Sequence, residues 1–238
     1  MVASIIFAVL GAVSIFFFLK ERIKNYSVKG TAIKSLASVF FIAVAISAWY
    51  SCIYSNNIKI MGLFIILGLL FGLLGDIWLE LKCVFVKEDK IFTYLGFIVF
   101  AIGHIIYITG MNIQYYIEGN VIYLIIPFIV AFLFTIGVLL LEKPMKVKYG
   151  KYKAIVIGYS FILSLMMAMA GSLAVLYNFK NMALNLMFIG GILFVISDLI
   201  LSGTYFGEGK SRPVDLISNI VVYYLAQYFI AFSLLFLL

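Results

Sequence analysis

The amino-acid sequence predicts an all-α membrane protein, a bundle of eight transmembrane helices, and two observations carry this prediction. Of the 238 residues, 66% are hydrophobic and only 11% are charged, and the mean hydropathy is +1.20. Such a chain has too little polar surface to cover a water-soluble globule. In addition, the apolar residues form eight runs that can each cross a hydrocarbon core of about 30 Å, which takes roughly 20 helical residues.

The eight runs follow one another with no soluble domain or low-complexity segment between them. The first run has the wrong flanks for a cleaved signal peptide, because basic residues follow it and none precedes it. The longest polar stretch is "EKPMKVKYGKYK" at 142–153, between the fifth and sixth runs. We therefore expect a single polytopic domain, residues 1–238. The predicted helices, in order, are 2–19, 36–54, 60–81, 91–111, 121–141, 155–177, 183–203 and 214–236.

The basic residues orient this bundle. The loops after the first, third, fifth and seventh helices hold 15 of the 17 Lys and Arg residues, and the opposite side keeps only Lys59 and Lys180. By the positive-inside rule, both termini should lie outside the cytosol, most simply across the cell membrane. The net charge of +7 is then a topology signal and a mild attraction to anionic lipid headgroups. The expected partner is the bilayer, since no stacking or groove-reading pattern indicates nucleic acid.

A weak internal repeat relates the third and fourth helices to the seventh and eighth. The stretch "LFGLLGDIWL" (70–79) aligns with "ILFVISDLIL" (192–201), which pairs Asp76 with Asp198. The similarity extends one helix further, because His104 follows Asp76 by 28 residues and Gln227 follows Asp198 by 29. Four helices separate the copies, so the halves are expected to be parallel repeats related by an axis along the membrane normal.

Polar residues inside the apolar runs are the candidate functional groups. Unsatisfied polar groups are costly in lipid, so these side chains should converge on one interior cavity. At a helical rise of about 1.5 Å per residue, both aspartates lie within roughly 10 Å of the cytosolic boundary, and His104 lies about 20 Å deep. The sequence thus predicts a polar funnel that opens to the cytosol and narrows toward His104. The candidates are Asp76, His104, Tyr107, Ser197, Asp198, Asn219, Tyr223, Tyr224 and Gln227.

Each candidate also has a structural interpretation. Either aspartate could extend its side chain to the interface or bond a neighbouring helix, and His104 could be a core histidine bonded across helices. Glu80, one turn beyond Asp76, is expected to be a solvated cytosolic residue. One His and two Cys do not provide a zinc site, so no metal is expected. Ser197 lacks a G-x-S-x-G elbow, which leaves a pair of carboxyl groups as the reactive centre.

Four segments resemble, in order and on alternating helices, the YhhN-like family of eight-span membrane proteins, whose characterised members are lysoplasmalogenases. They are "GDIWLELK", "FIVFAIGHIIYI", "GGILFVISDLIL" and "VVYYLAQYFIA". The segment "IKSLASVFFI" resembles the family's lysine-proline start of the second helix, although Ser35 follows Lys34 where the family has proline. In "GYSFILSLMMAMA", which resembles its sixth helix, Tyr159 takes the expected place.

The resemblance implies hydrolysis of the vinyl ether at the sn-1 position of a lysophospholipid, a lysoplasmalogen, without a cofactor. The products are a fatty aldehyde and a glycerophospho-ethanolamine or -choline. Paired carboxyl groups suit this chemistry, which needs an acid and a nearby anion, and Asp76 and Asp198 are the expected catalytic residues. A small transporter or lipid-binding protein that uses the same funnel is the alternative. The expected substrate-binding or supporting residues are Lys34, His104, Tyr107, Ser197, Asn219, Tyr223, Tyr224 and Gln227.

Overall fold

The computed structural model describes residues 1–53, 60–115, 121–207 and 212–237. Eight long helices in these ranges are each long and apolar enough to cross a membrane, which confirms the predicted fold class. Single turns of 3-10 helix, Val86–Glu88, Gly150–Tyr152 and Ser233–Phe236, adjoin them. The helices are α1 (Val2–Arg22), α2 (Val28–Ile53), α3 (Ile60–Val84), α4 (Asp89–Tyr115), α5 (Ile122–Leu140), α6 (Lys153–Leu176), α7 (Met182–Phe206) and α8 (Pro213–Phe232).

The largest boundary difference from the sequence prediction is at α2, which begins at Val28 and not at residue 36. The Gly30 N–H donates to the Ser27 hydroxyl at 3.0 Å, which satisfies one free donor of the first turn. The hydropathy pattern placed the start of the predicted helix after Lys34, because a charged ammonium group is typical of the boundary of a membrane span. Lys34 lies inside the helix, with its charge buried against α3.

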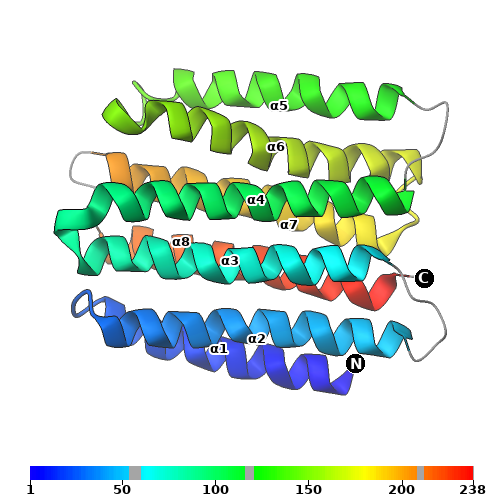
Figure 1. The fold of residues 1–238 in the computed structure, drawn as a ribbon, viewed down its shortest axis with the longest axis horizontal. Helices are drawn as coiled ribbons and strands as arrows, with labels where there is room; N and C mark the ends of the chain where they lie inside the picture. Colours follow the sequence, from blue (N-terminus) through cyan, green and yellow to red (C-terminus); the bar gives the residue numbers. More distant parts are fainter. Residues whose placement is uncertain (54–59, 116–120, 208–211, 238) are drawn as a thin grey trace.

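Helices that are neighbours in sequence form the main antiparallel pairs, α1 with α2, α3 with α4, α5 with α6 and α7 with α8. Across the bundle in Figure 1, α1 and α5 lie at opposite edges, α2 and α6 lie next to them, and α3, α4, α7 and α8 form the centre. The helices of the first half, α1–α4, therefore follow one another from one edge inward in the same order as α5–α8 do from the other edge. The edge helices are the least enclosed, with 22% of the α1 span and 17% of the α5 span buried.

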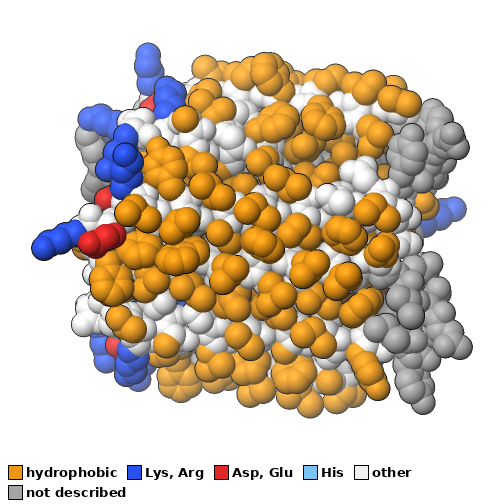
Figure 2. All heavy atoms as spheres, in the orientation of Figure 1, with side chains coloured by type: hydrophobic (Ala, Val, Ile, Leu, Met, Phe, Trp, Pro, Cys, Tyr) orange, Lys and Arg blue, Asp and Glu red, His pale blue; other side chains and the backbone are white. Residues whose placement is uncertain are grey.

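The two ends of the bundle differ in charge. Both termini lie at one end (Figure 1), and α1, α3, α5 and α7 end at the other. Lys and Arg side chains gather at this second end, while apolar side chains cover the visible flank between the ends (Figure 2). We call the second end the basic end. Lys59 and Lys210 are outside the described residues.

The tight pairing of α3 and α4 shapes part of the wall of a cavity in the centre of the bundle. Gly103 of α4 lies so close to α3 that a Cβ atom there would be 3.1 Å from the Gly68 carbonyl oxygen. Glycine therefore allows the two backbones to approach, as small residues do at helix contacts in membranes. The approach sets the α4 side chain Phe100 beside Asp76 in the wall of one cavity.

Candidate active site

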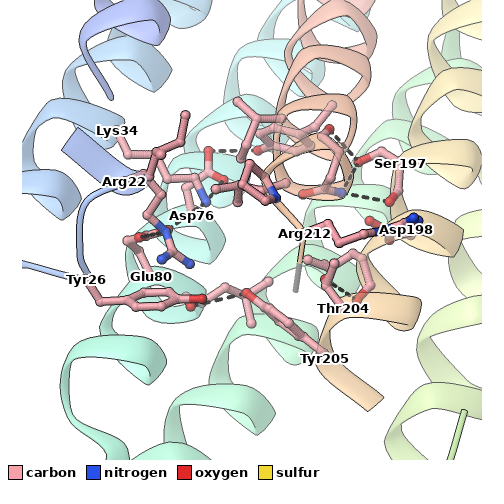
Figure 3. Close-up of a pocket in the computed structure, with 18 of the residues that line it drawn as sticks. Arg22, Tyr26, Lys34, Asp76, Glu80, Ser197, Asp198, Thr204, Tyr205 and Arg212 are labelled. Carbon is pink, nitrogen blue, oxygen red and sulfur yellow. Dashed lines mark hydrogen bonds and ion pairs between the residues drawn. The ribbon is translucent and has the colours of Figure 1, made fainter. Parts of the chain in front are cut away.

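A cavity of about 340 Å³ lies at the basic end of the bundle, between the loop that follows α1 and the ends of α3, α7 and α8 (Figure 3). Both predicted catalytic residues line it, and Figure 3 shows them on opposite sides of the space. The structure therefore brings together residues from both halves of the chain. The predicted site residues in its wall are Lys34, Asp76, Ser197, Asp198, Asn219 and Tyr223.

Asp76 is held by three partners from two other helices. The Lys34 ammonium of α2 lies 3.3 Å from Asp76 Oδ1. Ser38 of α2 and Tyr223 of α8 donate hydrogen bonds to Asp76 Oδ2 at 2.6 and 2.8 Å. Only 2% of Asp76 is exposed, so these groups replace the water that a carboxylate would otherwise bind.

Glu80 is buried, so the expectation of a solvated residue was wrong. Its carboxylate lies 2.7 Å from Arg22 Nε and 3.6 Å from Lys34 Nζ, and only 3% of the residue is exposed. Arg22 ends α1, and its guanidinium lies over the Tyr26 ring at 3.1 Å. The loop after α1 thus brings a cation and an aromatic ring to the end of α3, which the sequence position of Glu80 does not reveal.

Asp198 has different surroundings. Its Oδ2 accepts a hydrogen bond from the Tyr159 hydroxyl of α6. Phe97 and Leu201 lie with it in the cavity wall. Among the described residues, no Lys or Arg lies within ion-pair distance of this carboxyl group. One carboxyl group of the pair is therefore neutralised by a cation, and the other is bonded only to a phenol.

Helix α8 presents a polar face to α3 and α2. Gln227 donates from Nε2 to the Tyr223 hydroxyl at 2.9 Å, and Tyr223 in turn donates to Asp76. Tyr224 donates to the Lys34 carbonyl at 3.1 Å. Gln227 and Tyr224 are buried behind the cavity wall, so they support Asp76 and Lys34 without lining the cavity.

Ser197 and Asn219 tie α7 to α8 beside Asp198. The Asn219 amide donates to the Ser197 carbonyl at 2.7 Å and to its hydroxyl oxygen at 3.0 Å. Both residues are in the cavity wall. The serine hydroxyl is occupied in a contact between helices, which suits a supporting role and not that of a nucleophile.

His104 and Tyr107 do not line the cavity, so the predicted funnel does not extend to His104. The His104 ring is 1% exposed and packs 4.7 Å from Phe194, edge to face. Phe194 packs in turn 5.4 Å from Tyr223, so an aromatic layer separates the histidine from the cavity. No described residue hydrogen-bonds either His104 nitrogen or the Tyr107 hydroxyl.

Besides Glu80, three residues that bind the carboxyl groups of the site were not among the predicted site residues: Arg22, Ser38 and Tyr159. Ser38 is one helical turn after Lys34, so the i, i+4 rule would have placed it on the same face. Tyr159 was indicated only by the resemblance to the family's sixth helix. Arg22 carries no such signal, because its partner Glu80 is 58 positions away.

In the described part of the chain, no group of three or more His, Cys, Asp or Glu side chains is arranged to hold a metal ion. A protein-family model described as the YhhN family matches residues 3–234. This match extends over all eight helices. No curated protein and no solved structure matches the sequence.

Proposed function

The chain belongs to the YhhN family of membrane proteins, and from this premise we propose that it hydrolyses the sn-1 vinyl ether bond of a lysoplasmalogen. The products are a fatty aldehyde and a glycerophospho-ethanolamine or -choline. One observation carries the proposal: Asp76 and Asp198 line one cavity at the basic end, and among the described residues a cation pairs with Asp76 but not with Asp198. This asymmetry is what cleavage of a vinyl ether requires.

The partners of the two carboxyl groups support a proposed division of roles between them. Asp76 is ion-paired with Lys34 and accepts two hydrogen bonds, and all three contacts favour a carboxylate, so Asp76 is the stabilising anion. Asp198 accepts one hydrogen bond, at Oδ2, which leaves Oδ1 able to carry a proton. Asp198 is therefore the acid. The same division between two carboxyl groups cleaves glycosides through oxocarbenium ions.

The reaction then proceeds in two stages. Asp198 gives its proton to the β-carbon of the vinyl ether, and the positive charge forms on the α-carbon and the ether oxygen, where Asp76 stabilises it. Water adds to the α-carbon and returns a proton to Asp198, which yields a hemiacetal. In the second stage, the hemiacetal hydroxyl loses its proton to form the aldehyde carbonyl, the bond between the α-carbon and the glycerol oxygen breaks, and the glycerol oxygen takes up a proton.

The position of the cavity suits a one-chain phospholipid. Lys24 and Arg212 lie in its wall at the basic end, where a headgroup phosphate would be attracted. The sn-1 linkage of such a lipid lies just beneath its headgroup. In this arrangement the headgroup phosphate would lie at these cations, and the vinyl ether would lie between the two carboxyl groups.

The test is direct. Purified protein is incubated with lysoplasmenyl-ethanolamine, and the long-chain aldehyde is measured, with the saturated alkyl-ether analogue as the control. We expect aldehyde from the vinyl ether only, because the alkyl ether has no carbon that can be protonated. Binding of the lysolipid without aldehyde release would contradict the proposal and favour a lipid-binding or transport protein.

A further inference from the structure

A second, apolar pocket adjoins the polar cavity at Asp198. It has a volume of about 50 Å³ and lies among α4, α5, α6 and α7. Five residues are shared between the walls of the two spaces, so they meet at one place. The shared residues are Phe97, Tyr159, Asp198, Leu201 and Tyr205.

Protein closes this pocket at the basic end. Val147 of the loop after α5 pairs with Gly207 in an antiparallel bridge, and the Lys148 N–H donates to the Phe206 carbonyl at 2.8 Å. The Tyr149 ring packs 5.4 Å from the Phe206 ring, edge to face, and only 2% of Tyr149 is exposed. Both rings line the pocket. The loop thus separates the pocket from the water at this end of the bundle.

The opposite wall leads to the lipid-facing surface. Phe134 and Val138 of the edge helix α5 line the pocket, and 37% of Phe134 is exposed. The inner wall is formed by buried aliphatic side chains, such as Leu163 of α6 and Val195 of α7. A mostly apolar space that the loop covers at the basic end, and that borders a helix exposed to lipid, suits a hydrocarbon ligand.

We propose that this pocket binds the part of the hydrocarbon chain next to the ether bond of a single-chain lipid, while the polar cavity holds the glycerophosphate part. The junction of the two parts of such a lipid is its sn-1 linkage, and the junction of the two spaces is Asp198 and Tyr159. The pocket volume of about 50 Å³ leaves room for a short stretch of one chain. This inference rests on the proposed function for the reaction at the junction, but not for the identity of the bound chain.

The shape of the pocket, and not its hydrophobicity, would determine how it holds the chain. A chain gains little hydrophobic free energy when it leaves lipid for an apolar protein surface, because lipid tails are equally apolar. The fit of the chain therefore positions the ether bond at Asp198, and a side chain that fills the pocket should displace long chains only.

The first experiment measures binding without turnover. The probe is a saturated alkyl-ether lysophosphoethanolamine with a diazirine close to the ether, which the protein cannot cleave. After irradiation of the wild-type protein, we expect labelled peptides that contain pocket residues of α5, α6 and α7, and at least tenfold less labelling with an excess of the same lipid without diazirine. Labelling confined to other helices, or labelling that this excess does not reduce, would overturn the proposal.

The second experiment measures selectivity. Val138→Trp should lower kcat/KM at least tenfold for a 16-carbon vinyl ether substrate, but less than twofold for an ethenyl ether analogue that has no chain beyond the vinyl group. The matched control is Leu133→Trp on the same helix, where 61% of the side chain is exposed, and it should leave both values unchanged. An equal loss for both substrates, or a loss for neither, would contradict the inference.

The two experiments separate this inference from the proposed function. If no aldehyde forms from any substrate while the competed labelling maps to the pocket, the reaction is wrong and the chain site stands. If aldehyde forms while the labelling maps elsewhere, the reaction stands and the chain site is wrong.

Discussion

At the residue scale, the two aspartates show how identical side chains acquire different roles from their partners. Asp76 lies in a network of buried charges with Lys34, Glu80 and Arg22. Asp198 lies beside a tyrosine and apolar side chains. Buried charges are tolerated when each has a partner of opposite sign, so the network depends on all four members.

Replacement of either aspartate should abolish most of the activity. Asp76→Asn and Asp198→Asn each keep the size of the side chain but remove the acid or the anion. Each should lower turnover of lysoplasmenyl-ethanolamine at least about a hundredfold, the low end for acid-base groups. Aldehyde release is measured on variant protein that inserts into the membrane and stays folded at the assay temperature. Near-normal release from either variant would remove that residue from the mechanism.

Loss of the Glu80 carboxylate should destabilise the protein. Glu80→Gln leaves Arg22 and Lys34 with one anion, Asp76, and an unpaired buried charge costs about 3 kcal/mol. Thermal or denaturant unfolding in detergent measures the change. Glu142→Gln is the control, because Glu142 of the loop after α5 pairs with the half-exposed Lys153 at the start of α6, and such surface pairs contribute little. Equal stability of the two variants would mean that the Arg22–Glu80 contact does not stabilise the bundle.

His104 should contribute to packing and not to proton transfer. An aromatic layer separates it from the cavity, and no described residue hydrogen-bonds its ring. His104→Gln should therefore keep the shape of the pH profile of turnover and lower the melting temperature. Glutamine can form hydrogen bonds but cannot titrate, so a profile that loses a limb near the histidine range, at unchanged melting temperature, would show a catalytic role.

The wrong predictions for Glu80 and His104 have one cause. Depth along a helix follows from residue counts, and it correctly put Asp76 and Asp198 in one cavity. The rotation of each helix and the path of each loop depend on packing, so the sequence could not reveal that Arg22 reaches Glu80. Nor could it reveal that Phe194 shields His104.

At the scale of the elements, the apolar runs predicted all eight helices, because crossing a membrane demands a length that hydropathy measures directly. The start of α2 was the exception, since its buried lysine looked like a boundary. Glycines allow close packing between paired helices at a few positions. An added Cβ atom would meet a neighbouring backbone at some of these positions, and at other glycines it would meet nothing within 4 Å.

One glycine substitution tests the contact of α3 with α4. Gly103→Ala places a Cβ atom 3.1 Å from the backbone oxygen of Gly68, so the helices must separate slightly, and we expect a loss of about 1–3 kcal/mol. Gly137→Ala in α5 is the control, because a Cβ atom there meets nothing within 4 Å and alanine favours a helix. Unfolding in detergent compares the two. A Gly103→Ala protein as stable as the control would mean that the close approach is dispensable.

At the scale of the whole molecule, the order of helices is the same from both edges, and the site lies between the halves. Lys34 and Asp76 belong to the first half, whereas Tyr159, Asp198 and Tyr223 belong to the second. The short sequence repeat pairs Asp76 with Asp198, and the two residues lie on corresponding helices of the two halves, α3 and α7. The partners that distinguish the two aspartates were not visible, since they come from other helices.

The charge difference between the ends predicts the orientation of the whole bundle. Both termini lie opposite the basic end, so a tag at either terminus should be accessible from the non-cytosolic face. Impermeant labelling of intact cells measures this, with a tag in the loop 142–153 as the cytosolic control. Cytosolic accessibility of both termini would reverse the direction in which the cavity opens.

The two spaces lie toward different surroundings, the polar cavity toward the basic end and the apolar pocket toward the lipid-exposed helix α5. Hydrolysis where the two spaces meet would release one product into water and the other into the membrane. The glycerophosphodiester would leave into water, and the aldehyde would diffuse laterally into the bilayer without passing through the polar cavity. Product inhibition would then follow the ratio of aldehyde to lipid in the membrane, and dilution of the membrane with inert lipid would relieve it while dilution with buffer would not.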